Sequence, residues 1–221
     1  MTTIDFLDAY CERTGPGLWN EPLNAVTNLA FIAAGVMALR QWRKAPRLAW
    51  RNSWDLLLLI TLLFTIGVGS ALWHTFATRW SRFADEIPIL LFINLFLLAF
   101  LVRIGRTRWV GTLGLFALFH LLNFGVNAAF PREFLNGSIF YGPAWATLIV
   151  MAVFLAARKD PEARAFALAA GVFTVSLVLR TIDEAVCPAF PVGTHFLWHL
   201  CNAAMLYFLL VALIRSASGP D

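Results

Sequence analysis

Hydrophobic residues along the chain fall into seven long runs that are separated by short polar stretches. Each run is close to the roughly 20 residues that an α-helix needs to cross the hydrocarbon core of a bilayer. The runs cover about residues 21–41, 54–76, 85–102, 109–129, 139–157, 163–182 and 194–215. The pattern predicts an all-α bundle of seven transmembrane helices, and the short connections predict that consecutive helices are antiparallel neighbours.

The composition favours lipid over water as the solvent. Of the 221 residues, 60% are hydrophobic and only 14% are charged, whereas soluble domains average about 25% charged residues. No repeat or linker divides the sequence, so we expect residues 1–221 to form a single integral-membrane domain with an extramembrane segment at 1–20. The net charge of +4 does not indicate a nucleic-acid partner, because the basic residues cluster in short loops between apolar runs.

The charges of the loops predict the orientation of the chain in the membrane. Most of the 17 lysines and arginines fall in the loops after the first, third and fifth runs and in the C-terminal tail. Because positively charged loops stay on the cytoplasmic side, we expect the N-terminus outside and the C-terminus in the cytoplasm. Acidic residues show the opposite bias, and their excess on the outer side indicates that a cation is held there.

Three histidines converge on the outer side in this topology. His74 lies near the outer end of the second run, while His195 and His199 lie one helical turn apart at the outer start of the seventh. Histidines inside membrane segments are costly and usually face a partner or a cavity. Three imidazoles are one ligand set of a catalytic zinc site, which keeps a position open for water. The alternative is a satisfied interior histidine, which we prefer for His120, alone in the fourth run.

Two further polar residues can reach the same place. Asp85 follows His74 across a short turn, and a carboxylate there can hold a metal-bound water and accept its proton. Ser70 precedes His74 by one helical turn, so its hydroxyl can hydrogen-bond a substrate carbonyl or the oxyanion formed from it. With the three histidines, these residues predict a hydrolytic metal site.

Two of the three cysteines, Cys11 and Cys187, fall on the predicted outer side. An oxidising compartment on that side allows a disulfide that ties the N-terminal segment to the loop before the seventh run. Two free thiols are the alternative. Cys201 lies within the seventh run, where we expect it to be buried by packing.

The sequence around these residues resembles one known family. GSALWHTFATRWSRFADEIP resembles the second-to-third-helix signature of alkaline ceramidases, and THFLWH resembles their seventh-helix signature. YCERTGPGLWNEPLNAVTN resembles their N-terminal segment, so the likeness extends from about Tyr10 to about His199. Adiponectin receptors and haemolysin-III-like proteins are distant relatives with the same arrangement of serine, aspartate and three histidines.

The resemblance implies an intramembrane zinc hydrolase that cleaves the amide bond of ceramide or a similar lipid to a sphingoid base and a fatty acid. It implies zinc at His74, His195 and His199, with Asp85 as the proton acceptor and Ser70 near the oxyanion. The alternative is a seven-helix receptor-like or haemolysin-III-like membrane protein in which zinc only braces the helices.

The same resemblance implies a calcium site in the N-terminal segment. Glu12 and Glu21 match its acidic ligands, and the Tyr10 carbonyl matches a backbone ligand. Asp8 is offset by about one residue from the expected aspartate, and Thr14 stands where the family often has asparagine. A solvated acidic segment is the alternative.

Arg180, Asp183 and Glu184 lie near the outer end of the sixth run. We interpret them as an ion pair at the membrane interface, and contact with a substrate headgroup is the alternative.

Overall fold

The computed structural model describes residues 6–45, 47–131 and 133–219. Over these residues the chain is helical without strands, and seven segments are long and apolar enough to cross a membrane. The elements are α1 (Pro22–Thr27), α2 (Leu29–Lys44), α3 (Trp50–Phe76), α4 (Arg79–Arg103), α5 (Trp109–Ala129), η1 (Phe134–Tyr141), α6 (Gly142–Ala157), α7 (Ala163–Val186) and α8 (His195–Ser218). The first span combines α1 with α2, and the fifth combines η1 with α6. The predicted seven-helix architecture is confirmed.

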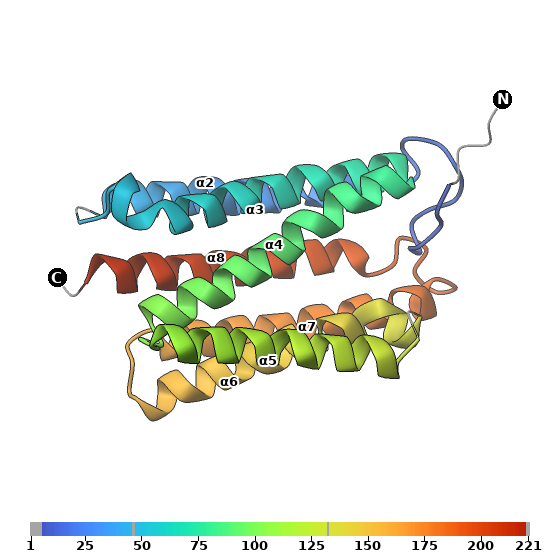
Figure 1. Ribbon diagram of the computed structural model, residues 1–221. Helices are drawn as coiled ribbons and strands as arrows, with labels where there is room; N and C mark the ends of the chain where they lie inside the picture. Colours follow the sequence, from blue (N-terminus) through green and yellow to red (C-terminus); the bar gives the residue numbers. More distant parts are fainter. Residues whose placement is uncertain (1–5, 46, 132, 220–221) are drawn as a thin grey trace.

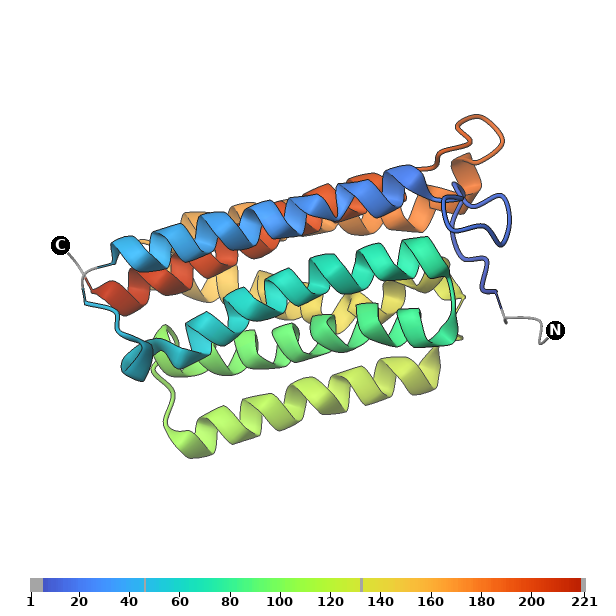
Figure 2. The same ribbon diagram turned by 90° about the horizontal axis from the view of Figure 1, so that it is seen from above.

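The last helix, α8, runs through the middle of the bundle. It lies between a layer formed by α2 and α3 and a layer formed by α5, α6 and α7 (Figure 1). It packs against both α2 and α7, so the first and last spans are neighbours. In their most apolar stretches, 56% of the residues of α3 and α8 are buried, against 11% for α5 at the periphery (Figure 2). The two helices that carry the three predicted ligands are therefore the most enclosed.

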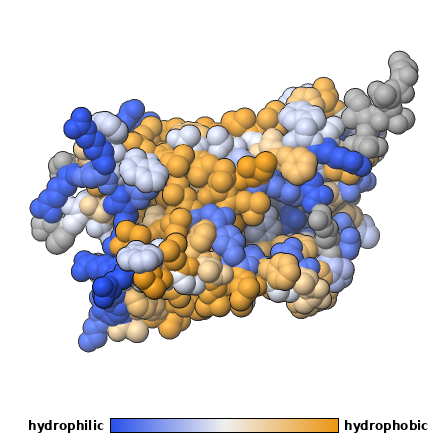
Figure 3. Space-filling view, viewed as in Figure 1, coloured by the Kyte–Doolittle hydropathy of each residue, from blue (hydrophilic) through white to orange (hydrophobic). Residues whose placement is uncertain are grey.

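The surface of the bundle matches a lipid environment. Large apolar side chains such as Leu121, Phe124 and Val150 are exposed on the peripheral helices. Figure 3 shows a hydrophobic band across the middle of one face, with hydrophilic residues at both ends. On this face the molecule is hollowed toward the end that carries the N-terminal segment, and hydrophilic residues line the hollow (Figure 3). The predicted integral, multi-pass character is confirmed.

The start of α4 differs from the sequence prediction. The helix begins at Arg79, six residues before the predicted start at Asp85, so Asp85 lies in its second turn. Thr78 precedes the helix, and its N–H donates to the Ser81 hydroxyl over 3.0 Å. The early turns are polar, and an exposed Arg82–Glu86 pair links them. Hydrophobic periodicity therefore missed this part of the helix.

Gly69 allows α3 and α4 to approach closely at the level of Asp85. A Cβ atom on Gly69 would collide with the carbonyl of Ala84. Pro88 lies inside α4, four residues after Ala84, and has no N–H to donate to that carbonyl. The carbonyl of Ala84 faces the bare Cα of Gly69, and this close crossing places Ser70 near Asp85.

Candidate metal centre

Three imidazoles meet where the end of α3 faces the start of α8. The ring centroids of His74 and His195 are 5.2 Å apart, and His199 lies 4.7 Å from each of them. One ligand nitrogen from each ring lies within 4.8 Å of the others, and all three side chains are buried. Among the described residues, this is the one group of three or more histidines, cysteines or carboxylates that can share a metal ion.

Neighbouring side chains fix the orientation of two of these rings. Nδ1 of His74 lies 2.5 Å from Oε2 of Glu21, and Nδ1 of His199 lies 2.9 Å from the Thr27 hydroxyl. Nε2 of His74 and Nδ1 of His195 are buried and have no hydrogen-bond partner within the described part of the chain. A buried polar atom without a partner costs free energy. A metal ion satisfies such nitrogens, and a carboxylate on the opposite ring nitrogen is the usual support for a histidine ligand. The residues present therefore fit a metal ion.

Glu21 is held as a carboxylate beside this group. Burial works to raise its pKa, but the hydrogen bond with His74 and the electrostatic interactions with His74 and Arg13 outweigh that effect and lower the pKa. The negative charge is thus retained close to the imidazoles. It stabilises any cation that they hold.

Asp85 and Ser70 complete the polar side of the site. Ser70 is buried on α3, and its hydroxyl lies close enough to the carboxylate of Asp85 on α4 to interact with it. Oδ1 of Asp85 is buried without a hydrogen-bond partner. Asp85 also interacts electrostatically with His74, so the carboxylate belongs to the same polar cluster as the imidazoles. The arrangement provides a proton acceptor and a hydroxyl donor beside the candidate metal ligands.

The N-terminal segment, residues 6–21, covers this end of the bundle. The ring of Tyr10 stacks on His195 with centroids 3.8 Å apart and lies 5.0 Å from His74. The N–H of Leu7 donates to the carbonyl of Ala77 in the α3–α4 turn over 2.9 Å. The segment therefore shields the imidazoles from that side.

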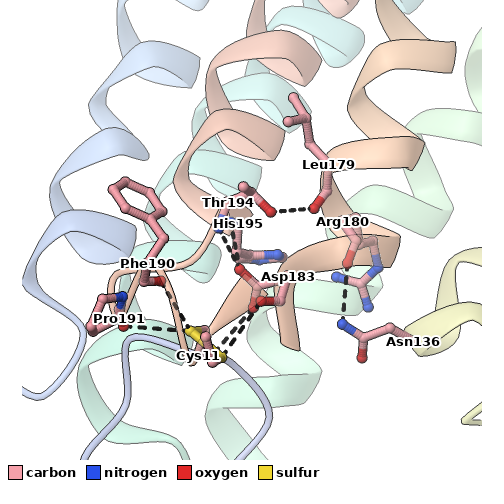
Figure 4. Close-up of a disulfide and its surroundings, with 10 residues drawn as sticks. Cys11, Asn136, Leu179, Arg180, Asp183, Phe190, Pro191, Thr194 and His195 are labelled. Atoms are coloured by element: carbon pink, nitrogen blue, oxygen red, sulfur yellow. Dashed lines mark hydrogen bonds between the residues drawn. A yellow bond between two sulfur atoms is a disulfide. The ribbon is translucent and has the colours of Figure 1, made fainter. Parts of the chain in front are cut away.

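Asp183 links α7, the start of α8 and the N-terminal segment. Its carboxylate accepts hydrogen bonds from the N–H groups of Thr194 at 2.7 Å, His195 at 2.9 Å and Cys11 at 3.1 Å (Figure 4). A carboxylate at a helix N-terminus pairs with unsatisfied N–H groups and with the helix dipole. Asp183 is fully buried, so it fixes the position from which His195 enters the site.

A disulfide reinforces the same junction. Cys11 is bonded to Cys187, and their Cα atoms are 5.5 Å apart (Figure 4). It joins the N-terminal segment to the region between α7 and α8, as the hypothesis from the sequence proposed. Cys201 is a free cysteine on α8 and is only partly buried.

Comparison with known proteins adds an independent observation. The model of the family described as Ceramidase matches residues 15–219, which is nearly the whole chain. The chain belongs to the ceramidase family. No curated protein gives a match. In this member of the ceramidase family, the three histidines, Ser70 and Asp85 all lie within the matched range.

The two glutamates of the implied calcium site already have other partners in this ceramidase-family chain. The carboxylate of Glu12 accepts the N–H groups of Leu23 at 2.7 Å and Asn24 at 2.8 Å, which satisfies the start of α1. One oxygen of Glu21 pairs with Arg13, and the other lies beside His74 and the side-chain amide of Asn24.

The other implied calcium ligands are also poorly arranged. Asp8 is exposed, and the carbonyl of Tyr10 accepts the N–H of Arg13 over 3.1 Å. Thr14 is exposed, with its hydroxyl 3.4 Å from the Asn20 side chain. Calcium requires six to eight oxygen ligands. The residues present do not fit this ion, because a buried guanidinium already occupies the carboxylate that would bind it.

Arg180 does not form the predicted ion pair, so that interpretation is wrong. Asp183 is committed to the start of α8, and no other described carboxylate forms a salt bridge with Arg180. The guanidinium instead lies 5.3 to 5.8 Å from the rings of Trp198, Tyr141 and Tyr10. Its Nε is buried without a hydrogen-bond partner. The ring of Tyr10 connects this aromatic box to His195.

His120 is also placed differently from the prediction. It is not an interior group but lies exposed on α5, with its ring edge-on to Phe116 at 4.6 Å. The peripheral position of α5 explains the difference, because most of its faces are exposed. His120 therefore lies on a different helix from the three clustered histidines, and it is exposed whereas they are buried.

Proposed function

We propose that this member of the ceramidase family is a zinc-dependent intramembrane hydrolase that cleaves the amide bond of ceramide or a close relative. One observation carries the proposal: three buried imidazoles converge, and two of their nitrogens lack a partner. Three protein ligands and one open position are typical of catalytic zinc. A zinc ion held there supplies hydroxide near neutral pH by lowering the pKa of water to about 7.

Two side chains near the histidines carry out proton transfer and stabilisation of the oxyanion. The unpaired carboxylate oxygen of Asp85 accepts the proton of the attacking water. Ser70 turns its hydroxyl toward the oxyanion that develops on the amide carbonyl. The proton held by Asp85 then passes to the leaving nitrogen, so that a fatty acid and a sphingoid base separate.

The surroundings strengthen these interactions by excluding water. Tyr10 covers His195, and the apolar helices on either side provide a low-dielectric environment. We propose that the polar end of the substrate occupies the hydrophilic hollow of Figure 3, while its hydrocarbon chains lie along the apolar helix faces with the amide at the histidines.

Arg180 is placed to bind the polar end of such a substrate. Its guanidinium lies against three aromatic rings, and its Nε has no hydrogen-bond partner among the described residues. Hydroxyl oxygens next to the amide of a sphingoid lipid are suitable acceptors for this donor. We propose that Arg180 contacts them.

We place this end of the bundle outside the cytoplasm. The basic loops lie at the opposite end, where positive charge stays on the cytoplasmic side, and the disulfide at the histidine end fits an oxidising compartment. Reaction of single introduced cysteines with an impermeant thiol reagent in intact cells tests this orientation. Labelling of the α2–α3 loop but not of the N-terminal segment would reverse it.

The alternative is a receptor-like protein in which the metal only braces helices. Turnover separates the two functions. Purified protein is incubated with a fluorescent ceramide, as prepared, after chelation, and after zinc is restored. We expect fatty acid release only in the first and third samples, with about one zinc per chain by elemental analysis, because the described residues contain one such ligand set. Bound zinc without turnover of any lipid amide would favour the bracing role.

A further inference from the structure

Arg13 is a buried cation outside the set of residues that the proposed reaction uses. Its side chain has no exposed surface, although it belongs to the N-terminal segment that precedes the first span. A buried charge is costly unless it is paired and hydrogen-bonded. The partners of Arg13 therefore show why this arginine is retained inside the protein.

The guanidinium contacts oxygen atoms from three separate parts of the chain. Nε pairs with Oε1 of Glu21, and Nη2 donates to the carbonyl of His74 at the end of α3 over 2.7 Å. Nη1 lies 3.3 Å from the carbonyl of Gly15 and 3.4 Å from that of Gly17. One carboxylate and three backbone carbonyls thus surround a single positive charge. This is the kind of oxygen cage that calcium sites use.

The same contacts connect Arg13 to the metal centre. Glu21 offers one carboxylate oxygen to Arg13 and the other to Nδ1 of His74. Arg13 also holds the backbone of His74 directly. A carboxylate that orients a histidine ligand commonly contributes about 10- to 100-fold to metal affinity or activity. The orientation of Glu21 in turn depends on its contact with Nε of the guanidinium, whose terminal nitrogens are held by backbone carbonyls.

We propose that Arg13 is the permanent cation of the N-terminal segment. It holds this segment on the bundle and positions Glu21 against His74, so the protein requires no calcium there. Arg13 is a positioning residue, since it acts on the metal through Glu21. The inference rests on the proposed zinc site, but not on the identity of the substrate.

The test compares Arg13→Met and Arg13→Lys with the wild type, and uses Arg82→Met as a matched control. Arg82 is an exposed arginine at the same end that pairs with Glu86 over 2.7 Å. Zinc affinity is measured by competition with a chromogenic chelator, and hydrogen exchange is followed in residues 6–21. We expect Arg13→Met to lose about 10- to 100-fold in zinc affinity and to lose protection in this segment. Arg13→Lys should recover part of both, and Arg82→Met should change neither.

A double-mutant cycle keeps the proposal testable if Arg13→Met folds poorly. Arg13→Lys and Glu21→Gln act on the same chain of contacts, so their effects on zinc affinity should be clearly less than additive. Full additivity would contradict the proposal, as would unchanged zinc affinity in Arg13→Met.

The wild type should also show the same melting temperature and turnover after calcium removal and in millimolar calcium. A calcium-dependent rise in either would show that a second cation is needed. Neither zinc affinity nor hydrogen exchange depends on a substrate, so both measurements test the proposal even if ceramide is not the substrate.

Discussion

The two ends of the bundle use similar ion pairs in different ways. At the end opposite the histidines, Arg103 binds Asp55 through two contacts of 2.5 and 2.7 Å, and Arg215 binds Glu162 at 2.6 Å. These pairs keep partial exposure and join one helix to another. At the histidine end, Arg13 and Glu21 are completely enclosed and lead directly to His74.

Of the eight buried side-chain atoms that have no hydrogen-bond partner among the described residues, four come from residues assigned to the candidate site. Nε2 of His74, Nδ1 of His195, Oδ1 of Asp85 and Nε of Arg180 are all buried without a hydrogen-bond partner, and all belong to the histidine end. The ion pairs at the other end satisfy one another. In a low-dielectric interior an unpaired polar atom is costly, so a cluster of them indicates a ligand that the protein itself does not supply. Both ends contain largely buried ion pairs, so burial of charge alone does not distinguish a functional site from a pair that only joins helices.

The largest effect is expected when an imidazole is removed from the cluster. His199→Ala leaves two ligands, so zinc content should fall to background and turnover with it, because the metal supplies several kcal/mol of transition-state stabilisation. His120→Ala is the matched control, since that histidine is exposed on α5. Metal analysis and fluorescent ceramide turnover check both variants. Hydrolysis by metal-free His199→Ala would refute the mechanism.

Asp85→Asn separates metal binding from proton transfer. The amide keeps the shape of the side chain but cannot accept the proton, so turnover should fall by about 100- to 10,000-fold. Zinc content should stay near that of the wild type, because the three imidazoles remain. Loss of metal together with activity would instead assign Asp85 to the ligand set.

Ser70→Ala should have a smaller effect. Removal of one donor to an oxyanion lowers kcat by about 100-fold, while metal content and KM stay nearly constant. Steady-state kinetics on the fluorescent ceramide measure the division between kcat and KM. A change confined to KM would indicate that Ser70 binds the ground state and not the oxyanion.

Arg180→Met tests whether the unpaired guanidinium binds the substrate. Loss of a charged hydrogen bond should raise KM by about tenfold or more, with a smaller change in kcat. The effect should shrink for an amide substrate that lacks the hydroxyls next to the nitrogen. Equal losses on both substrates would mean that Arg180 only supports the aromatic box.

The sequence predicts the spans and the histidines better than the contacts around them. Seven apolar runs locate the helices because lipid demands continuous hydrophobic segments, and histidines within such runs stand out. The start of α4 escaped because its first turns are polar. Arg13 escaped because its contact with His74 spans 61 positions and depends on how an irregular segment folds back. The position of Arg180 and Asp183 at the outer end of one apolar run was a usable signal, but their spacing alone did not show that they contact different partners.

The smallest functional effect is expected at the opposite end of the bundle. Asp55→Asn weakens the contact with Arg103, whose guanidinium also donates to the carbonyl of Asn52 over 2.8 Å. Both side chains are mostly buried and joined by two contacts, so loss of the pair should cost about 3 kcal/mol, and the melting temperature should fall by about 6–12 °C. Turnover and zinc content should stay within about twofold of the wild type, a margin of only about 0.4 kcal/mol. A large loss of activity in a variant that still binds zinc would mean that this end of the bundle is coupled to the reaction. The degree of exposure of an ion pair would then not show whether the pair serves catalysis or only joins helices.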